Sequence, residues 1–264
     1  MEPVKPWVVF LTYGLAVVGV LLFSALAGMV LFNLDPDLKP DDLGLRGVIA
    51  GAVASSMAFG FATVAATRGM PASRIRVLPG RERGRDLLAM VVGVLALGQA
   101  LDSAATLAGL GREGAMERVR RALQGASGGD LFAAVIVIGV MAGVAEELFF
   151  RGYMQSLLRE RWRPGTAAVV TSLCFSVLHP DPVHATLAFV LALYLGFVTE
   201  MAGSALPAAT CHVVNNIVFT LLTTLVAPIT RAAVHQALLA VCVIVFVAAV
   251  VWLRRSLGGR ASGG

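Results

Sequence analysis

Charged and hydrogen-bonding side chains interrupt three long apolar segments of this sequence. They are Glu146, Glu147 and Arg151 in the first segment, His179 in the second, and His212 with Asn216 in the third. Ionisable groups are costly inside hydrocarbon, so each of them is a candidate functional residue. A carboxylate without a cation can act as a general base on water, and imidazole and amide groups can shuttle a proton or stabilise an oxyanion. These residue types suffice for hydrolysis of an amide bond.

The spacing of the three charges on the first segment separates their roles. Glu147 and Arg151 are four residues apart with the acid first, which favours an ion pair on one helix face. Glu146 is rotated by about 100° from Glu147 on an ideal helix, so its carboxylate is free to point elsewhere. We therefore predict Glu146 as the base and the Glu147–Arg151 pair as its support. The alternative for this pair is an ion pair with a purely structural role.

The other two segments repeat the four-residue spacing. Phe175 and His179 place an apolar ring beside an imidazole, and His212 and Asn216 place two hydrogen-bonding groups side by side, while Asn215 faces away. Simpler roles stay open for both pairs. His179 could be a helix-terminal residue bonded to backbone, and His212 with Asn216 could be a polar contact that holds helices together.

The expected depths of these residues agree. Counted from the predicted helix ends, Glu146 lies about 18 Å, His179 about 22 Å and His212 about 12 Å from one membrane surface. All three are therefore predicted near the middle of a bilayer, where they could meet.

The elements that must position these residues are membrane helices. The chain has 264 residues, 58% of them hydrophobic and only 14% charged, with mean hydropathy +0.82. This composition predicts an all-α polytopic membrane protein that forms a single membrane domain over 1–264. The motifs fall within 131–228, and 255–264 is expected to be a flexible tail. The eight expected spans are about 7–34, 48–67, 87–110, 131–158, 165–179, 184–200, 205–228 and 231–253.

The distribution of arginine predicts the orientation. The strongest basic cluster lies between the second and third spans, and basic residues in short loops face the cytoplasm. Both termini are then expected in the cytoplasm, and the expected location is a bacterial inner (cell) membrane. The basic loop at 112–130 would lie outside, where its sequence can form an amphipathic interfacial helix. Because orientation accounts for the positive charge, we expect the partners to include the lipid bilayer and no nucleic acid.

Three further polar residues have less defined roles. His184 and His235 lie near expected span ends, so they are interpreted as interface residues. Asp102 lies inside the third expected span, where it is either the partner of a cation such as Arg151 or part of a water-filled path. The sequence does not decide between these two roles.

Three motifs together resemble those of a known protein family. They are Glu146-Glu147-x-x-x-Arg151, Phe175-x-x-x-His179 and His212-x-x-x-Asn216. In this order and inside apolar helices, they are similar to the motifs of the CAAX protease and bacteriocin-processing family, the type II CAAX endopeptidase relatives.

The resemblance implies a glutamate-type intramembrane endopeptidase without a cofactor. Glu146 would activate water with help from His179, and His212 with Asn216 would form the oxyanion site. Glu147 and Arg151 would hold the site together. The implied substrate is a membrane-inserted or lipid-modified protein or peptide, cut near its C-terminus or membrane anchor.

Two competing interpretations remain. The sequence lacks the H-E-x-x-H motif of zinc proteases, yet two glutamates and two histidines could bind zinc, so a zinc enzyme is the less favoured mechanism. The other possibility is a transporter, immunity or scaffold protein that uses the same buried polar cluster without catalysis.

Overall fold

A computed structural model describes residues 2–38, 43–110, 114–179 and 181–261, and every regular element in these ranges is a helix. In chain order the helices are α1 Pro6–Leu34, α2 Gly44–Ala66, α3 Gly84–Leu107, α4 Ala115–Leu123, α5 Gly128–Ala134, η1 Val135–Ala142, α6 Gly143–Glu147, η2 Leu148–Gln155, α7 Ser156–Arg159, α8 Pro164–Ser176, α9 Pro182–Ala202, α10 Leu206–Leu225 and α11 Ala232–Ala261. The predicted all-α class is confirmed.

Among the described residues, seven helical segments are long and apolar enough to cross a membrane, counting the continuous stretch from α5 to α7 as one. The chain is therefore an integral membrane protein. The expected span at 165–179 is shorter than predicted, because α8 ends at Ser176 after 13 residues. Its backbone then turns, with the His179 N–H donating to the Ser176 carbonyl oxygen.

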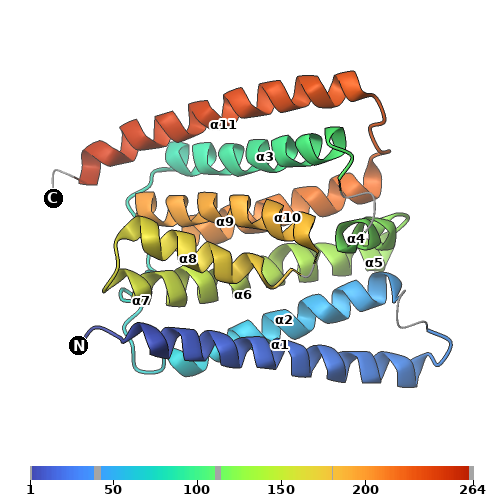
Figure 1. The fold of residues 1–264 in the computed structure, drawn as a ribbon, viewed down its shortest axis with the longest axis horizontal. Coiled ribbons are helices and arrows are strands. Elements are labelled where there is room, and N and C mark those ends of the chain that lie inside the picture. The colour runs from blue at the N-terminus through green and yellow to red at the C-terminus, as the bar shows by residue number, and fades with distance from the viewer. Residues whose placement is uncertain (1, 39–42, 111–113, 180, 262–264) are drawn as a thin grey trace.

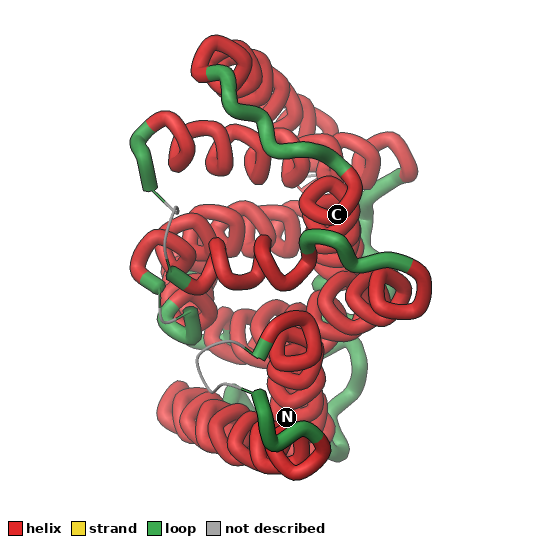
Figure 2. The backbone as a smooth tube through the Cα atoms, turned by 90° about the vertical axis from the view of Figure 1, so that its right-hand side faces the viewer, coloured by secondary structure: helices red, strands yellow, loops and turns green. Residues whose placement is uncertain are grey.

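The helices lie roughly parallel in three layers. Figure 1 shows α11 and α3 at one side, α1 and α2 at the other, and α8, α9, α10 and the α5–α7 stretch between them. The end view in Figure 2 shows the same stacking along the helix axes. The middle layer carries all three motifs, so the site lies in the centre of the bundle.

Two apolar cores hold the layers together. One gathers aromatic side chains around Phe59, Phe149, Phe150 and Phe175, which join α2 to the middle layer. The other packs α3 and α11 on α9 around Tyr194. Burial of these side chains supplies the packing that fixes helices in a membrane, where the hydrophobic effect between helices is absent.

The helix at the C-terminus extends beyond its predicted end. The expected flexible tail at 255–264 is wrong for 255–261, which continue α11, while 262–264 lie outside the described residues. Leu253 and Leu257 are fully buried in the second core, and Ser256 Oγ donates to Asp86 Oδ1 of α3 at 2.5 Å. These contacts hold the last turns of α11 against α3.

The central helix departs from regular α-helical geometry twice. The segments η1 and η2 are π-helical and lie on either side of α6, the short segment that carries the two glutamates. Wide π turns change the direction in which side chains leave a helix and often occur at functional sites. Here they flank the charged motif.

Candidate active site

The described structure brings the two glutamates and His212 together. Glu146 and Glu147 of α6 face His212 of α10, with Oε2 of Glu146 at 3.8 Å from Nε2 and Oε1 of Glu147 at 3.0 Å from Nδ1. One imidazole therefore lies between two carboxylates. Residues that are 65 and 66 positions apart along the chain become neighbours because α10 packs on α6.

Glu147 and Arg151 form a fully buried ion pair. Arg151 Nη1 lies 3.2 Å from Glu147 Oε1, and neither side chain is exposed. Arg151 Nη2 also donates to the Ala192 carbonyl oxygen at 2.9 Å, and its guanidinium lies over the Phe175 ring. The predicted ion pair is present. The same Glu147 oxygen has a second partner, since it also contacts His212.

The bond to Glu147 restricts the protonation of His212. A carboxylate accepts hydrogen bonds only, so Nδ1 must carry a proton where it meets Glu147. A neutral His212 then has an unprotonated Nε2, which accepts a hydrogen bond but cannot donate one. Nε2 becomes a donor toward Glu146 or an oxyanion only when the ring carries both protons.

Glu146 and His179 line a common cavity of ≈ 340 Å³. Its walls come from α1, α2, α8 and the turn after α8, and they are apolar apart from these two residues and Ser55. Phe175 separates His179 from His212, with its ring centroid 5.2 Å and 6.0 Å from the two imidazoles. A carboxylate and an imidazole thus face one small, mainly apolar space.

The amide of Asn216 has a partner on the central helix. Its Nδ2 donates to the Ile138 carbonyl oxygen of η1 at 3.3 Å. An amide nitrogen carries two hydrogens, so one N–H remains for another acceptor. Asn215 turns toward α3, where its Oδ1 would lie 2.9 Å from a Cβ added at Gly98, in agreement with the prediction that it faces away.

Within the described ranges, no group of three or more His, Cys, Asp or Glu side chains is arranged to hold a metal ion. Independence from metals remains a prediction, which activity measurements must test.

The three motifs now lie in one bundle, and a family comparison covers all of them. Residues 128–218 match the Rce1-like family of type II CAAX prenyl endopeptidases. The resemblance inferred from the motifs is thereby confirmed over that segment. The search of curated proteins finds no match for the chain. The Rce1-like segment spans α5 to the middle of α10, so α1–α4 and α11 lie outside the match.

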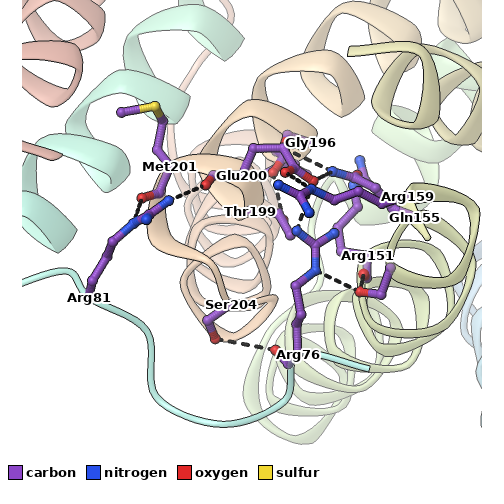
Figure 3. Close-up of polar contacts among 12 residues, drawn as sticks. Arg76, Arg81, Arg151, Gln155, Arg159, Gly196, Thr199, Glu200, Met201 and Ser204 are labelled. Atoms are coloured by element: carbon purple, nitrogen blue, oxygen red, sulfur yellow. Dashed lines mark hydrogen bonds and ion pairs between the residues drawn. The ribbon is translucent and has the colours of Figure 1, made fainter. Parts of the chain in front are cut away.

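A basic residue from the loop after α2 reaches the Rce1-like segment. Arg76 Nη1 lies 2.8 Å from Glu200 Oε1 of α9, and its Nε donates to Ser156 Oγ, which in turn donates to the Arg151 carbonyl oxygen (Figure 3). Arg159 binds the other oxygen of Glu200 at 2.6 Å. Burial lowers the pKa of the Arg76 guanidinium, and Glu200 opposes that effect. The sequence indicated only the location of this loop, whereas Arg76 also fastens it to the motif helix.

Asp102 has a cation partner other than Arg151. Its carboxylate pairs with Arg120 of α4, the amphipathic helix that was predicted within 112–130. Of the two open roles for Asp102, the ion pair is the one found, and α4 itself packs on α2 and α10.

The two histidines interpreted as interface residues have other surroundings. His235 is buried, with its ring nitrogens 3.0 Å from the Ile229 carbonyl oxygen and 3.3 Å from Ser103 Oγ. His184 lies against His179 of the Rce1-like segment, with 4.3 Å between ring centroids. The five-residue separation from His179 could have suggested this contact, but only a tight turn after α8 makes it possible.

Two glycines that the sequence reasoning missed allow α10 to approach the glutamates. A Cβ added at Gly139 would lie 2.7 Å from Ile217 Cγ1, and one at Gly143 would lie 3.1 Å from Val213 Cγ2. The signal was the G-x-x-x-G spacing, which lets membrane helices pack closely.

Proposed function

We propose that this protein is an intramembrane endopeptidase, which hydrolyses a peptide bond near the C-terminus or membrane anchor of a protein or peptide substrate. The observation that carries the proposal is the cavity shared by Glu146 and His179, two residues of the Rce1-like segment. An acid residue and an imidazole from different helices meet there in a space large enough for a water molecule and a short length of chain.

The proposed reaction begins at the Glu146 carboxylate. It accepts a proton from water while the hydroxide oxygen bonds to the scissile carbonyl carbon, and His179 holds the same water from the other side. The C–N bond of the tetrahedral intermediate then breaks, and the proton passes from Glu146 through His179 to the leaving amine. The products are a carboxylate and an amine.

His212 and Asn216 are the proposed oxyanion donors. The contact with Glu147 fixes Nδ1 of His212 as a donor, so Nε2 stabilises the oxyanion when the imidazole is doubly protonated. The Glu147 carboxylate supplies the compensating charge. Asn216 contributes the N–H that Ile138 does not use. Glu147 and Arg151 support the site, and Phe175 forms the apolar surface between the two imidazoles.

The walls of the cavity support a membrane-embedded substrate. Leu21 of α1 and Val177 after α8 both line it, and 66% and 67% of these side chains are exposed on the surface that lipid would cover. Tyr13 Oη donates to the Cys174 carbonyl oxygen at 2.8 Å and holds α1 to α8 beside this space. An apolar segment or lipid group of the substrate would enter from the bilayer between these two helices.

The orientation we propose places the basic end of the bundle in the cytoplasm of a bacterial cell, in the inner membrane. The start of α1 and the end of α11 lie at one end of the bundle (Figure 1). The loop after α2 and the turn between α7 and α8, both rich in arginine, lie at that end too.

The decisive experiment compares wild-type protein with Glu146→Gln in a strain that lacks the gene. Mass spectrometry of membrane proteins should reveal C-terminal or anchor fragments released by wild type and absent with Glu146→Gln, while His235→Ala, buried away from the cavity, should behave as wild type. The purified enzyme should keep its activity in a chelator. Equal processing by Glu146→Gln would refute the mechanism, and loss of activity in the chelator would favour a zinc enzyme. If neither wild type nor any variant processes a protein, a scaffold or transporter would be favoured.

A further inference from the structure

The ring of His179 is held mainly by other rings. Its centroid lies 5.2 Å from that of Phe175 and 4.3 Å from that of His184, with interplanar angles of 60° and 64°. Nδ1 is buried and makes no hydrogen bond of good geometry within the described residues, although the imidazole lies beside the Phe175 and Ser176 carbonyl groups. Packing between two aromatic neighbours, together with these carbonyl groups, therefore sets the direction of this imidazole.

The two neighbours belong to different helices. Phe175 is in the last turn of α8, and His184 is in the first turn of α9. His179 lies in the connection between them, which the helices on either side must position. Without the His184 ring, the imidazole would be supported on one side only.

The first turn of α9 is itself firmly fixed. Asp181 is the N-cap, and its Oδ1 accepts hydrogen bonds from the backbone N–H groups of Val183 at 2.9 Å and His184 at 3.0 Å. Pro182 follows at the first helical position, where its restricted φ favours the helix. A Cβ added at Gly114, just before α4, would lie 2.0 Å from Asp181 Oδ2, so the backbone of Gly114 lies against this cap. His184 thus projects from an anchored helix start.

We propose that His184 is a positioning residue, which holds the His179 imidazole in its catalytic orientation through ring contact. It acts through His179 and not on the substrate, because the described cavity lining includes His179 but not His184. The effect of His184 on the rate rests on the proposed function. The ring contact between His184 and His179 can be tested without measuring any activity.

The first test uses the small number of histidines. The chain contains four, so ¹³C-labelled histidine gives four imidazole signals in the full protein in lipid nanodiscs, assigned by single substitutions. We expect His184→Ala to shift or broaden the His179 signal. His184→Phe, which keeps an aromatic ring, should restore it. His235→Ala, on α11, is the matched control and should leave it unchanged.

The second test measures cleavage by the same variants. A misplacement of about 1 Å can lower a rate by roughly 100-fold, so His184→Ala should lower kcat by about 10- to 100-fold. Its KM should stay within about twofold of wild type, because the cavity walls are unchanged. His184→Phe should recover most of kcat.

The results separate this proposal from the function on which it rests. An unaltered His179 signal in His184→Ala, or failure of His184→Phe to restore an altered one, would overturn the positioning role whatever the activity. An inactive wild type with the expected signals would refute the proposed function and leave the ring contact established. Wild-type kcat in His184→Ala would overturn the kinetic role.

Discussion

Two adjacent glutamates have opposite surroundings. Glu147 is completely buried and contacts both Arg151 and His212, whereas Glu146 keeps some exposure and faces the cavity. A carboxylate with two buried partners supports structure, and one that faces an open space is available for chemistry. The same substitution at the two positions should therefore have different effects.

Glu147→Gln should reduce stability strongly, because it leaves the Arg151 guanidinium without its buried counter-charge. Breaking such a pair costs about 3–5 kcal/mol. Glu146→Gln should remove activity with little loss of stability. Thermal unfolding of both variants in the same detergent measures the difference, and equal melting temperatures would contradict this division of roles.

The Glu147–Arg151 ion pair was predictable from residue types and spacing, but the contact of Glu147 with His212 was not. Helical geometry on a single segment pairs Glu147 with Arg151, and the structure contains that pair. The contact of Glu147 with His212 depends on how α6 and α10 are rotated against each other. Side-chain packing between the two helices determines that rotation. The residue pattern within one helix carries no information about it.

At the scale of elements, close packing of α10 on the central helix assembles the site. Gly139 and Gly143 present a surface without side chains to Ile217 and Val213 of α10. This contact lies one turn from the glutamates, so the distance between the two helices sets the distance from Glu146 to His212.

Gly143→Leu should push α10 away and lower cleavage by roughly 100-fold, through a displacement of about 1 Å at the reacting groups. The backbone nitrogen of Val213 would lie 3.2 Å from the new Cβ, so a rotamer change alone cannot relieve the contact. The control is Gly28→Leu in α1, where nothing lies within 4 Å. Peptide cleavage by membrane-inserted protein is the measurement, and near-wild-type activity of Gly143→Leu would show that the packing is not required.

The order of the long apolar helices was also predictable, but eight spans were expected, whereas seven helical segments among the described residues are long enough to cross a membrane. Two helix ends differ from the prediction, and a tertiary contact explains the second of them. α8 stops at Ser176 although apolar residues continue to Leu178, and α11 continues because Leu257 and Ser256 bind α3. The pair of Asp102 with Arg120 joins α3 to α4, and no local pattern indicated it.

At the scale of the whole molecule, a polar clasp joins the N-terminus to the basic end of the bundle. Glu160, just after α7, binds Arg74 Nε at 2.6 Å and accepts a hydrogen bond from the Val4 backbone N–H at 2.8 Å. Three segments that are distant in sequence meet there: the start of the chain, the loop after α2 and the end of the central helix.

This clasp should make stability depend on pH. The hydrogen bond from Arg74 holds the pKa of Glu160 below its usual value. A lowered folded-state pKa contributes stability that is present above the unfolded pKa, near 4.5, and is lost as pH falls through the folded value. We expect the melting temperature of wild type to fall more steeply below pH 5 than that of Glu160→Gln. Glu117→Gln, in α4 at the other end, is the control and should follow wild type. Parallel curves for wild type and Glu160→Gln would refute the role of the clasp.

The shortness of α8 has a consequence for how the protein is made. Its 13 residues measure about 20 Å, less than the hydrocarbon thickness of about 30 Å. During synthesis, such a segment cannot cross the bilayer alone, so we expect α8 to enter together with α9 as one hairpin. His179, in the turn of that hairpin, would then be carried into the membrane before His212 of α10 leaves the ribosome. The proposed site would therefore be complete only after α10 has joined the bundle, late in the insertion of the chain.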